Sequence, residues 1–497
     1  MVATFLVVAL ALAKSADATE ADARKLVLSR FEKVGRASPQ SDTALDKAAW
    51  ALANLALETS ATKSAELLAV TQAVSRAGAS DPSPKMFVVK ARPAKEALEA
   101  LRRRVDLANE SMTHLGIGAA TKGEDTALVV LLSHRKASLR PFPRQLPAKP
   151  SPQRLCAEMA PGLVDPEVFV TEPGGNVKRY GLKALADMPA CGTLTLSLEG
   201  RYTVEVLARG ERGPVVSALF FVTVGSGSDD VADAPVEPTD SYVAKVRITD
   251  RINALRQSAG LEPLIGDDDL DSIAVAYAEK LSKQRDIGHA DTDGTTLVGR
   301  LKNAGYVFGL AGENLALASG PLAAHFGIEH SPGHRNNLLD AKYQRIGIGL
   351  AMRADRSTVL VEIVAAPPEE LSDPRATVKE IIAAARAKAG LRRLDADPAL
   401  DQVADDHARL ALEKDLPKSE IDGVKVHDKV FEVVPAADRA SADVVVVRDL
   451  RRLPAPKNAL GAGLQRVGVG VVQGDSPRLG NDLYWVVVVY VEFKEGP

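Results

Sequence analysis

The sequence predicts a multidomain chain of mixed α/β class, in which α+β units recur around a small all-β module. Three observations predict it. The 497 residues exceed what one hydrophobic core organises. Related segments recur in the second half of the chain, and between the α+β segments lies a stretch of alternating apolar and polar residues with a tight turn.

The composition and net charge of the chain indicate how its cores are built and which partners it is not expected to bind. Hydrophobic residues make up 46% of the chain but aromatic residues only 4%, so the cores must be built mainly from Ala, Val and Leu. A formal charge of -3 and a pI near 6.3 provide no broad attraction to phosphate. Nucleic acid is therefore not an expected partner.

The N-terminus carries an apolar run, residues 4–13, followed by Ala16-Asp17-Ala18, the small-x-small pattern that a signal peptidase accepts. We predict a signal peptide over 1–18, a mature chain without a transmembrane segment, and a secreted or periplasmic location. No Lys or Arg precedes the run, which leaves a buried N-terminal helix as the alternative.

Proline-rich and acidic stretches predict the domain boundaries. Linkers are expected at 139–153, at 225–241 and between 366 and 375. They leave four segments: 19–138, 154–224, 242–366 and 375–497.

The segment 154–224 predicts a β-sandwich. Residues 202–206 alternate strictly between apolar and polar side chains, a turn follows at 210–213, and an apolar strand runs over 215–224. The hairpin resembles the late strand pair of immunoglobulin-like modules. In an oxidising compartment Cys156 and Cys191 would pair, which stabilises by roughly 3 to 4 kcal/mol, whereas two separate buried thiols are the alternative.

An internal repeat links the last two segments. Residues 259–261 and 389–391 both read Ala-Gly-Leu, and residues 344–349 match 465–470. The first segment, 19–138, is an α+β unit with weaker matches, so a third copy and an unrelated fold both stay open.

The third segment predicts helices and strands in a defined order. One helix ends at Gly260, a second begins after the acidic run Asp267-Asp268-Asp269 with a continuous apolar stripe, and a third runs from Pro321 to His330. Ser331 is expected to cap the next helix, which would place His334 in its first turn. Two strands close the segment, and Gly347 and Gly349 on one strand face predict close packing against the backbone.

Four of the eight histidines, His289, His325, His330 and His334, fall between 289 and 334, with Glu313 in a Gly-Glu-Asn triplet between them. Two imidazoles and a carboxylate can hold a divalent ion, zinc first among them, with Glu313 as general base. The alternative is that each histidine is hydrogen-bonded and inert.

The order of these motifs, with SPGHRNNLL at 331 and RIGIGL at 345, resembles the bacterial, SCP-like branch of the CAP superfamily, the cysteine-rich secretory, antigen 5 and pathogenesis-related proteins. The resemblance covers residues 245–366 and implies an α-β-α sandwich, with degenerate copies at 375–497 and 19–138. It also implies a cleft where two histidines and two glutamates meet, in some members around a metal.

By position His289, Glu313 and His334 match three of these four cleft residues, and Ser331 stands where the second glutamate is expected. Glu329 and, one turn earlier, His325 are candidate substitutes. Asn314 is expected to stabilise the backbone turn.

The other copies lack these residues, since Ala455 takes the place of His334 and no Gly-Glu-Asn triplet occurs there. The sequence therefore favours an exported binding or scaffolding protein with a lipid, glycan or protein ligand. The alternative is a metal-dependent hydrolase acting through His289, Glu313 and His334, although no GxSxG nucleophile motif is present. A purely structural spacer is a third hypothesis.

Overall fold

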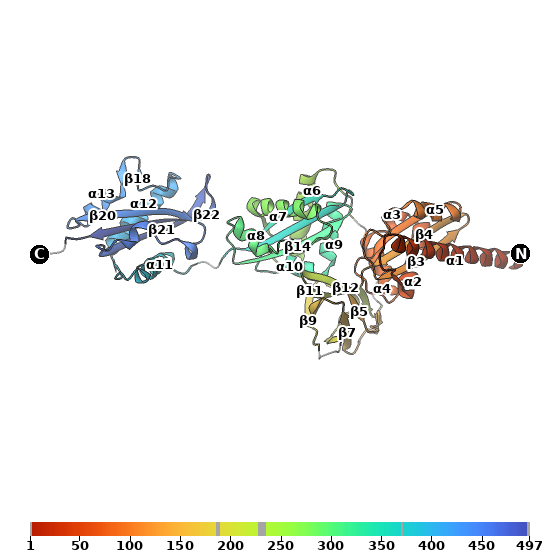
Figure 1. Cartoon of the computed structure of the whole chain (residues 1–497). Helices are drawn as coiled ribbons and strands as arrows, with labels where there is room; N and C mark the ends of the chain where they lie inside the picture. Colours follow the sequence, from red (N-terminus) through yellow and green to blue (C-terminus); the bar gives the residue numbers. More distant parts are fainter. Residues whose placement is uncertain (1, 185–188, 227–234, 369–370, 495–497) are drawn as a thin grey trace. The chain divides into compact units, whose positions relative to one another are not determined.

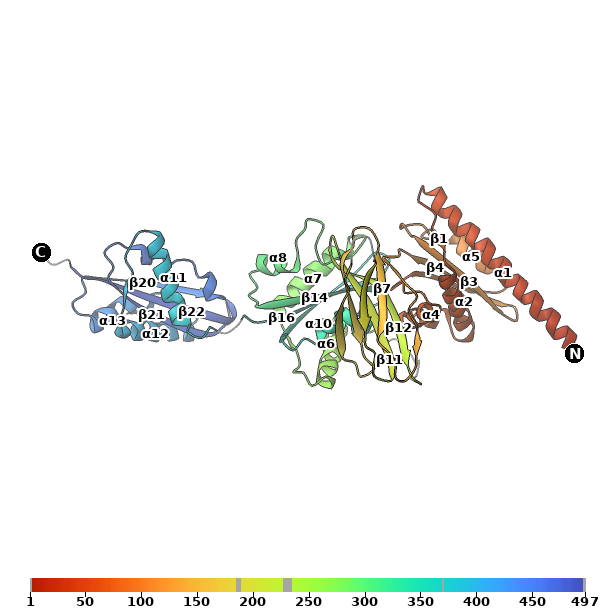
Figure 2. The same cartoon turned by 90° about the horizontal axis from the view of Figure 1, so that it is seen from below.

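The structure is a computed structural model that describes residues 2–184, 189–226, 235–368 and 371–494 (Figures 1 and 2). The chain divides into two compact units, Met1–Ala366 and Pro367–Pro497, and each is described by itself. The first unit holds the N-terminal domain, the β-module and the histidine-bearing third domain. The second unit is the C-terminal domain.

The N-terminal domain is a sheet between two helical layers. Its helices are α1 (Val2–Lys33), α2 (Thr43–Glu58), α3 (Ala61–Ser64), α4 (Leu67–Arg76) and α5 (Ala94–Arg103), and its strands are β1 (Gln40–Ser41), β2 (Lys85–Ala91), β3 (His114–Lys122) and β4 (Asp125–Ser133). α1 and α5 pack on one face of the sheet, and α2 and α4 on the other.

The predicted signal peptide falls inside α1, which runs unbroken through residue 18. Its later turns bury Ala23, Val27 and Phe31 in the domain core. In the described part of the chain, no helix has the length and apolarity to cross a membrane.

The third domain has the same layering. Its helices are α6 (Ser241–Ser258), α7 (Asp268–Ser282), α8 (Leu297–Asn303), α9 (Pro321–His330) and α10 (Pro332–Leu338), and its strands are β13 (Ile265–Gly266), β14 (Leu310–Ala318), β15 (Arg345–Met352) and β16 (Thr358–Ala366). α6 and α9 cover one sheet face and α7 and α8 the other. Pro321 and Pro332 open α9 and α10 as predicted.

The C-terminal domain repeats the arrangement, with α11 and α12 on opposite faces of its sheet (Figure 1). Its helices are α11 (Pro374–Lys388), α12 (Pro398–Glu413) and α13 (Val426–Val433), with short 3₁₀ turns at Leu450–Arg452 and Lys457–Leu460. Its strands are β17 (Asp395–Ala396), β18 (Glu420–Ile421), β19 (Val424–Lys425), β20 (Arg439–Val447), β21 (Arg466–Ser476) and β22 (Gly480–Glu492).

The main sheets of the three domains share one strand order: β1-β3-β4-β2, β13-β15-β16-β14 and β17-β21-β22-β20. In each, a two-residue strand pairs in parallel with the first strand of the central hairpin. A glycine of that hairpin strand allows close contact with the helix that follows the two-residue strand. A Cβ at Gly116, Gly347 or Gly468 would lie 2.2 to 2.3 Å from a backbone carbon of that helix. The predicted close packing is thus present in all three.

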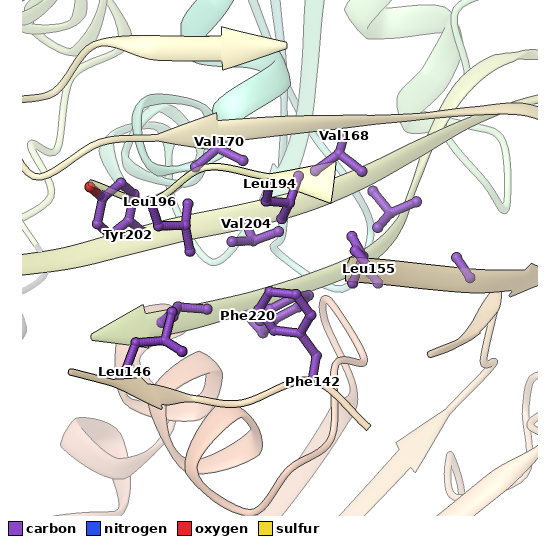
Figure 3. Packing of buried hydrophobic residues seen from close by; sticks show 14 of the residues in the cluster. Phe142, Leu146, Leu155, Val168, Val170, Leu194, Leu196, Tyr202, Val204 and Phe220 are labelled. Atoms are coloured by element: carbon purple, nitrogen blue, oxygen red, sulfur yellow. The ribbon is translucent and has the colours of Figure 1, made fainter. Parts of the chain in front are cut away.

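The β-module consists of two sheets, with strand orders β10-β7-β5 and β6-β12-β11-β8-β9. Its strands are β5 (Ala137–Leu139), β6 (Gln145–Leu146), β7 (Gln153–Met159), β8 (Val164–Thr171), β9 (Val177–Gly181), β10 (Ala190–Leu194), β11 (Gly200–Gly210) and β12 (Gly213–Val224). Figure 3 shows the core that fills the module, in which Tyr202 of β11 lies beside Leu196 and Val204 of the same strand lies beside Leu194.

Two predictions about the module's edges have different outcomes. Cys156 and Cys191 form the predicted disulfide between β7 and β10. The linker predicted at 139–153 instead carries β6 and buries Phe142 and Leu146 in the module core, because its apolar side chains find a partner surface there (Figure 3). Of the linker predicted at 225–241, residues 227–234 lie outside the described residues.

Candidate functional site

The first half of the site surrounds Glu313 of β14. Its carboxylate Oε1 lies 3.0 Å from His289 Nδ1, and its other oxygen accepts a bond from Arg300 of α8. The Arg300 guanidinium also stacks 3.4 Å from the ring centroid of Tyr277 and donates to the His289 carbonyl at 3.1 Å. The Glu313 side chain is only 2% exposed. Both oxygens of this buried carboxylate are therefore engaged by cationic or imidazole donors.

The second half lies at the start of α10. Ser331 is the N-cap residue of α10, as predicted, but its side chain makes no capping hydrogen bond to the helix. Its hydroxyl donates instead to Glu205 Oε1 at 2.6 Å and lies 2.8 Å from His334 Nδ1. Glu205 Oε2 accepts the Gly333 N–H at 2.5 Å. A carboxylate from β11 of the β-module thus performs the capping that a serine oxygen usually performs.

Burial controls the acid-base character of this half. It raises the pKa of Glu205 to about 7, although the hydrogen bonds from Ser331 and Gly333 oppose the rise. Burial, together with a smaller effect of the charge of His289, lowers the pKa of His334 to about 4. Asn337 of α10 links the two halves, because its side-chain amide donates to the Glu313 carbonyl at 3.4 Å and to Asn314 Oδ1 at 3.0 Å.

The β11–β12 hairpin docks on the site through Arg212. Its guanidinium donates to the Ala290 carbonyl at 2.8 Å, the Asp286 carbonyl at 2.9 Å and the Gln284 side chain at 2.7 Å. In return, the Ala290 N–H donates to the Arg212 carbonyl at 3.0 Å. The hairpin therefore fixes the loop that carries His289.

Glycines allow this close approach. A Cβ at Gly213, whose φ is +107°, would lie 2.8 Å from His289 Cβ, and a Cβ at Gly288 would lie 2.9 Å from the Arg212 side chain. A Cβ at Gly333 would lie 2.5 Å from Leu207. The module and the third domain meet with no room for larger residues at these points.

Three predicted cleft residues, His325, Asn314 and Glu329, lie in a hydrogen-bonded network that adjoins the site. His325 Nδ1 is 2.8 Å from Glu362 Oε1, and both side chains are fully buried. Asn314 donates to Glu362 at 3.2 Å and to the His334 carbonyl at 3.3 Å, so it supports more than a local turn. Glu329, proposed as a substitute carboxylate, pairs with Arg251 at 2.5 Å.

The donors in the site do not fit a divalent ion. Glu313 is already shared between His289 and Arg300, and a guanidinium beside the carboxylate opposes a cation. Within the described ranges, no three His, Cys, Asp or Glu side chains form a group that could hold a metal. Zinc binding therefore stays a prediction.

Glu205, Ser331 and His334 also differ from a hydrolytic triad. In a triad, the imidazole lies between the serine and the carboxylate, so that it can take the serine proton. Here the serine lies in the middle, bonded to the carboxylate on one side and to the imidazole on the other. The arrangement holds the serine proton rather than activating the oxygen.

Sequence reasoning found His289, Glu313, Ser331 and His334 but missed Glu205, Arg212 and Arg300. A signal for docking was present in β12, whose apolar run is continuous rather than alternating. Such a strand must be covered on both faces. Its outward Phe221 packs with Leu68 of the N-terminal domain and Phe326 of the third domain.

Comparison with known proteins identifies the third domain. Residues 249–364 match the family model described as CAP, the Cysteine-rich secretory protein family. This part of the chain is a CAP domain, which confirms the prediction made from its motifs.

Similar proteins include both sequences and solved structures. An uncharacterized membrane protein, YlbC, of Bacillus subtilis is 31% identical over 106 residues, which are 21% of this chain and 30% of that protein. The match thus spans under a third of that relative. An outer surface protein of Borrelia burgdorferi is 26% identical, over 27% of this chain and 99% of that one, with a TM-score of 0.25. An extracellular protein of Bacillus anthracis containing an SCP domain is 17% identical, over 47% and 89%, with a TM-score of 0.24.

Proposed function

We propose that the chain is an exported binding protein whose binding unit is the CAP domain together with the β-module docked on its histidine site. The ligand is a lipid, a glycan or a protein. One observation carries the proposal: the polar groups of the site are held in internal hydrogen bonds across the two domains, as in a preorganised recognition surface.

The main alternative, hydrolysis, has less support. A general base needs a free acceptor near the reacting group, whereas Glu313 has both oxygens occupied and the Ser331 proton is directed to Glu205. We therefore favour recognition over turnover.

We further propose that residues 19–138 and 375–497 are degenerate CAP-like copies and that the β-module is immunoglobulin-like. Their shared strand order and glycine contacts support common descent of the three α+β domains. The copies would act as spacers or additional binding surfaces, and the metal-dependent chemistry considered from the sequence is not part of the proposal.

Equilibrium binding of the full chain tests the proposal. The probes are phosphatidylcholine vesicles with and without phosphatidylglycerol, N-acetylglucosamine oligosaccharides and a random peptide array. We expect binding to one class that weakens at least tenfold in an Arg212→Ala, His289→Ala variant, because both side chains lie at the domain junction. Binding unaffected by that variant, or turnover of an ester probe that depends on His289, would refute it.

A further inference from the structure

Glu205 reaches the CAP site from 126 residues away in sequence. It comes from β11 and is fully buried, and its neighbours on the adjacent strands are Phe169 and Leu219, both apolar. Its two oxygens form hydrogen bonds to the start of α10, one with the Ser331 hydroxyl and the other with the Gly333 N–H. A carboxylate is thus delivered to the position where Ser331 replaces the glutamate expected from the family resemblance.

In the contact between Glu205, Ser331 and His334, the position of one proton determines the position of the next. Ionised Glu205 can only accept, and it receives the Gly333 N–H at one oxygen and the Ser331 O–H at the other. Ser331 has a single hydroxyl proton, so its oxygen can only accept from His334 Nδ1, 2.8 Å away. His334 must then carry its ring proton on Nδ1. The bond that Asn314 makes to His334 goes to the carbonyl and does not involve the ring.

We propose that Glu205 is a positioning residue of the CAP site: through Ser331 it fixes the proton of neutral His334 on Nδ1 and leaves the Nε2 lone pair to accept from a ligand hydroxyl or amine. The inference rests on the proposed function and deepens it by naming the ligand group. It also makes the β-module part of the site rather than a neighbour of it.

Nitrogen NMR of the full chain, labelled with ¹⁵N-histidine, tests this at pH 8.5, where Glu205 is ionised. The ring nitrogen shifts distinguish a protonated from an unprotonated nitrogen, and His334→Asn identifies the signals. We expect Nδ1 protonated in the natural sequence. A wild-type His334 protonated on Nε2 overturns the inference without any further variant.

Glu205→Gln should move the proton to Nε2. The Gly333 N–H retains the amide oxygen as its acceptor, so the NH₂ group faces Ser331, whose hydroxyl then donates to His334. Glu167→Gln is the matched control, since Glu167 pairs with Arg179 on an exposed part of the same module and should leave His334 unchanged. An unchanged His334 in Glu205→Gln, with the Ala290 amide still protected from exchange by the docked hairpin, overturns the inference.

Ser331→Ala covers the case in which Glu205→Gln undocks the module. It removes the hydroxyl that connects Glu205 to His334 and keeps the carboxylate. Both neutral tautomers of His334 should then be populated, whereas His334 protonated on Nδ1 alone would contradict the inference.

Titration with N-acetylglucosamine oligosaccharides, followed on the same signals, separates the two proposals. Binding about tenfold weaker in Glu205→Gln supports the inference, and the expected tautomers with no binding by any probe class refute the proposed function alone.

Discussion

The CAP domain and the C-terminal domain have one framework but not one site. In both, a buried arginine, Arg256 or Arg386, donates to backbone carbonyls, and an aspartate, Asp271 or Asp401, accepts a strand N–H at 2.7 or 2.8 Å. Strand register allows a direct comparison at the site: Glu313 opposes Ile363, whereas Ala442 opposes the equivalent Val489. The shared arginine and aspartate contacts are therefore kept in the C-terminal domain without the glutamate of the site.

The same register applies to the N-terminal domain. Met86 on β2 occupies the position of Glu313, opposite Leu131. The comparison teaches that the close glycine contacts are kept in all three domains, while among the described residues only the CAP domain carries the polar site.

The largest expected effect tests the framework. In Gly347→Val, the new Cβ would lie 2.3 Å from the backbone of Leu270, and in Gly468→Val 2.2 Å from that of Leu400. We expect each change to cost about 4 kcal/mol or more and to unfold its own domain. Hydrogen exchange measured by mass spectrometry locates the loss, and Gly266→Ala, with open space around the new Cβ, is the control. Equal loss in both domains from one substitution would contradict separate frameworks.

The second prediction concerns pH and belongs to the CAP side alone. Burial raises the pKa of Glu205 from 4.5 to about 7, so the folded chain holds a proton that the unfolded chain releases between these values. The free energy of unfolding should therefore fall, relative to Glu205→Gln, by about 3 kcal/mol as pH rises from 4.5 to above 7. Denaturant titrations of both proteins across this range measure the difference.

His334 provides the opposite slope in the same measurement. Its pKa is lowered from 6.5 to about 4, so stability is lost as pH falls from 6.5 to 4, when only the unfolded chain binds the proton. Glu205→Gln should retain the loss of stability at low pH that His334 causes. It should no longer show the loss of stability above pH 4.5 that Glu205 causes. A difference curve that is flat with pH would show that Glu205 is not buried against the CAP domain.

A smaller effect is expected from Arg212→Ala. It removes three hydrogen bonds to the loop that carries His289, so we expect a loss of about 2 kcal/mol confined to the first unit. Exchange of the Ala290 amide should rise, while α12 in the C-terminal domain should be unaffected. Protection of Ala290 that does not change would mean that other contacts hold the hairpin.

The smallest expected effect is the change in unfolding midpoint on adding zinc. Because Arg300 and His289 already occupy the Glu313 carboxylate, added zinc should not shift the unfolding midpoint of either unit measurably. Calorimetry with and without chelator checks this. A shift that disappears in His289→Ala would restore the metal-dependent alternative.

Local signals predicted much of the fold. Pro321 and Pro332 mark helix starts because their fixed φ suits the first turn, and alternation over 202–206 predicts a strand because only a strand has a period of two. His289 and Glu313 were found as a pair because the family resemblance fixes their order. Glu205 could not be found in this way, since its contact depends on the docking of two domains and leaves no periodicity near either residue. Ser331 was correctly predicted as the N-cap residue of α10, but the bond from its hydroxyl to Glu205 could not be predicted, for the same reason.

The Glu205 contact also changes what a domain boundary means in this protein. A fragment that begins at residue 242 would contain every residue of the family match and yet lack the acceptor for Ser331 and Gly333. Its first turn of α10 would face water, and its His334 would adopt whichever tautomer the solvent favours. Recombination or excision at that boundary would retain every residue of the family match while discarding part of the recognition chemistry.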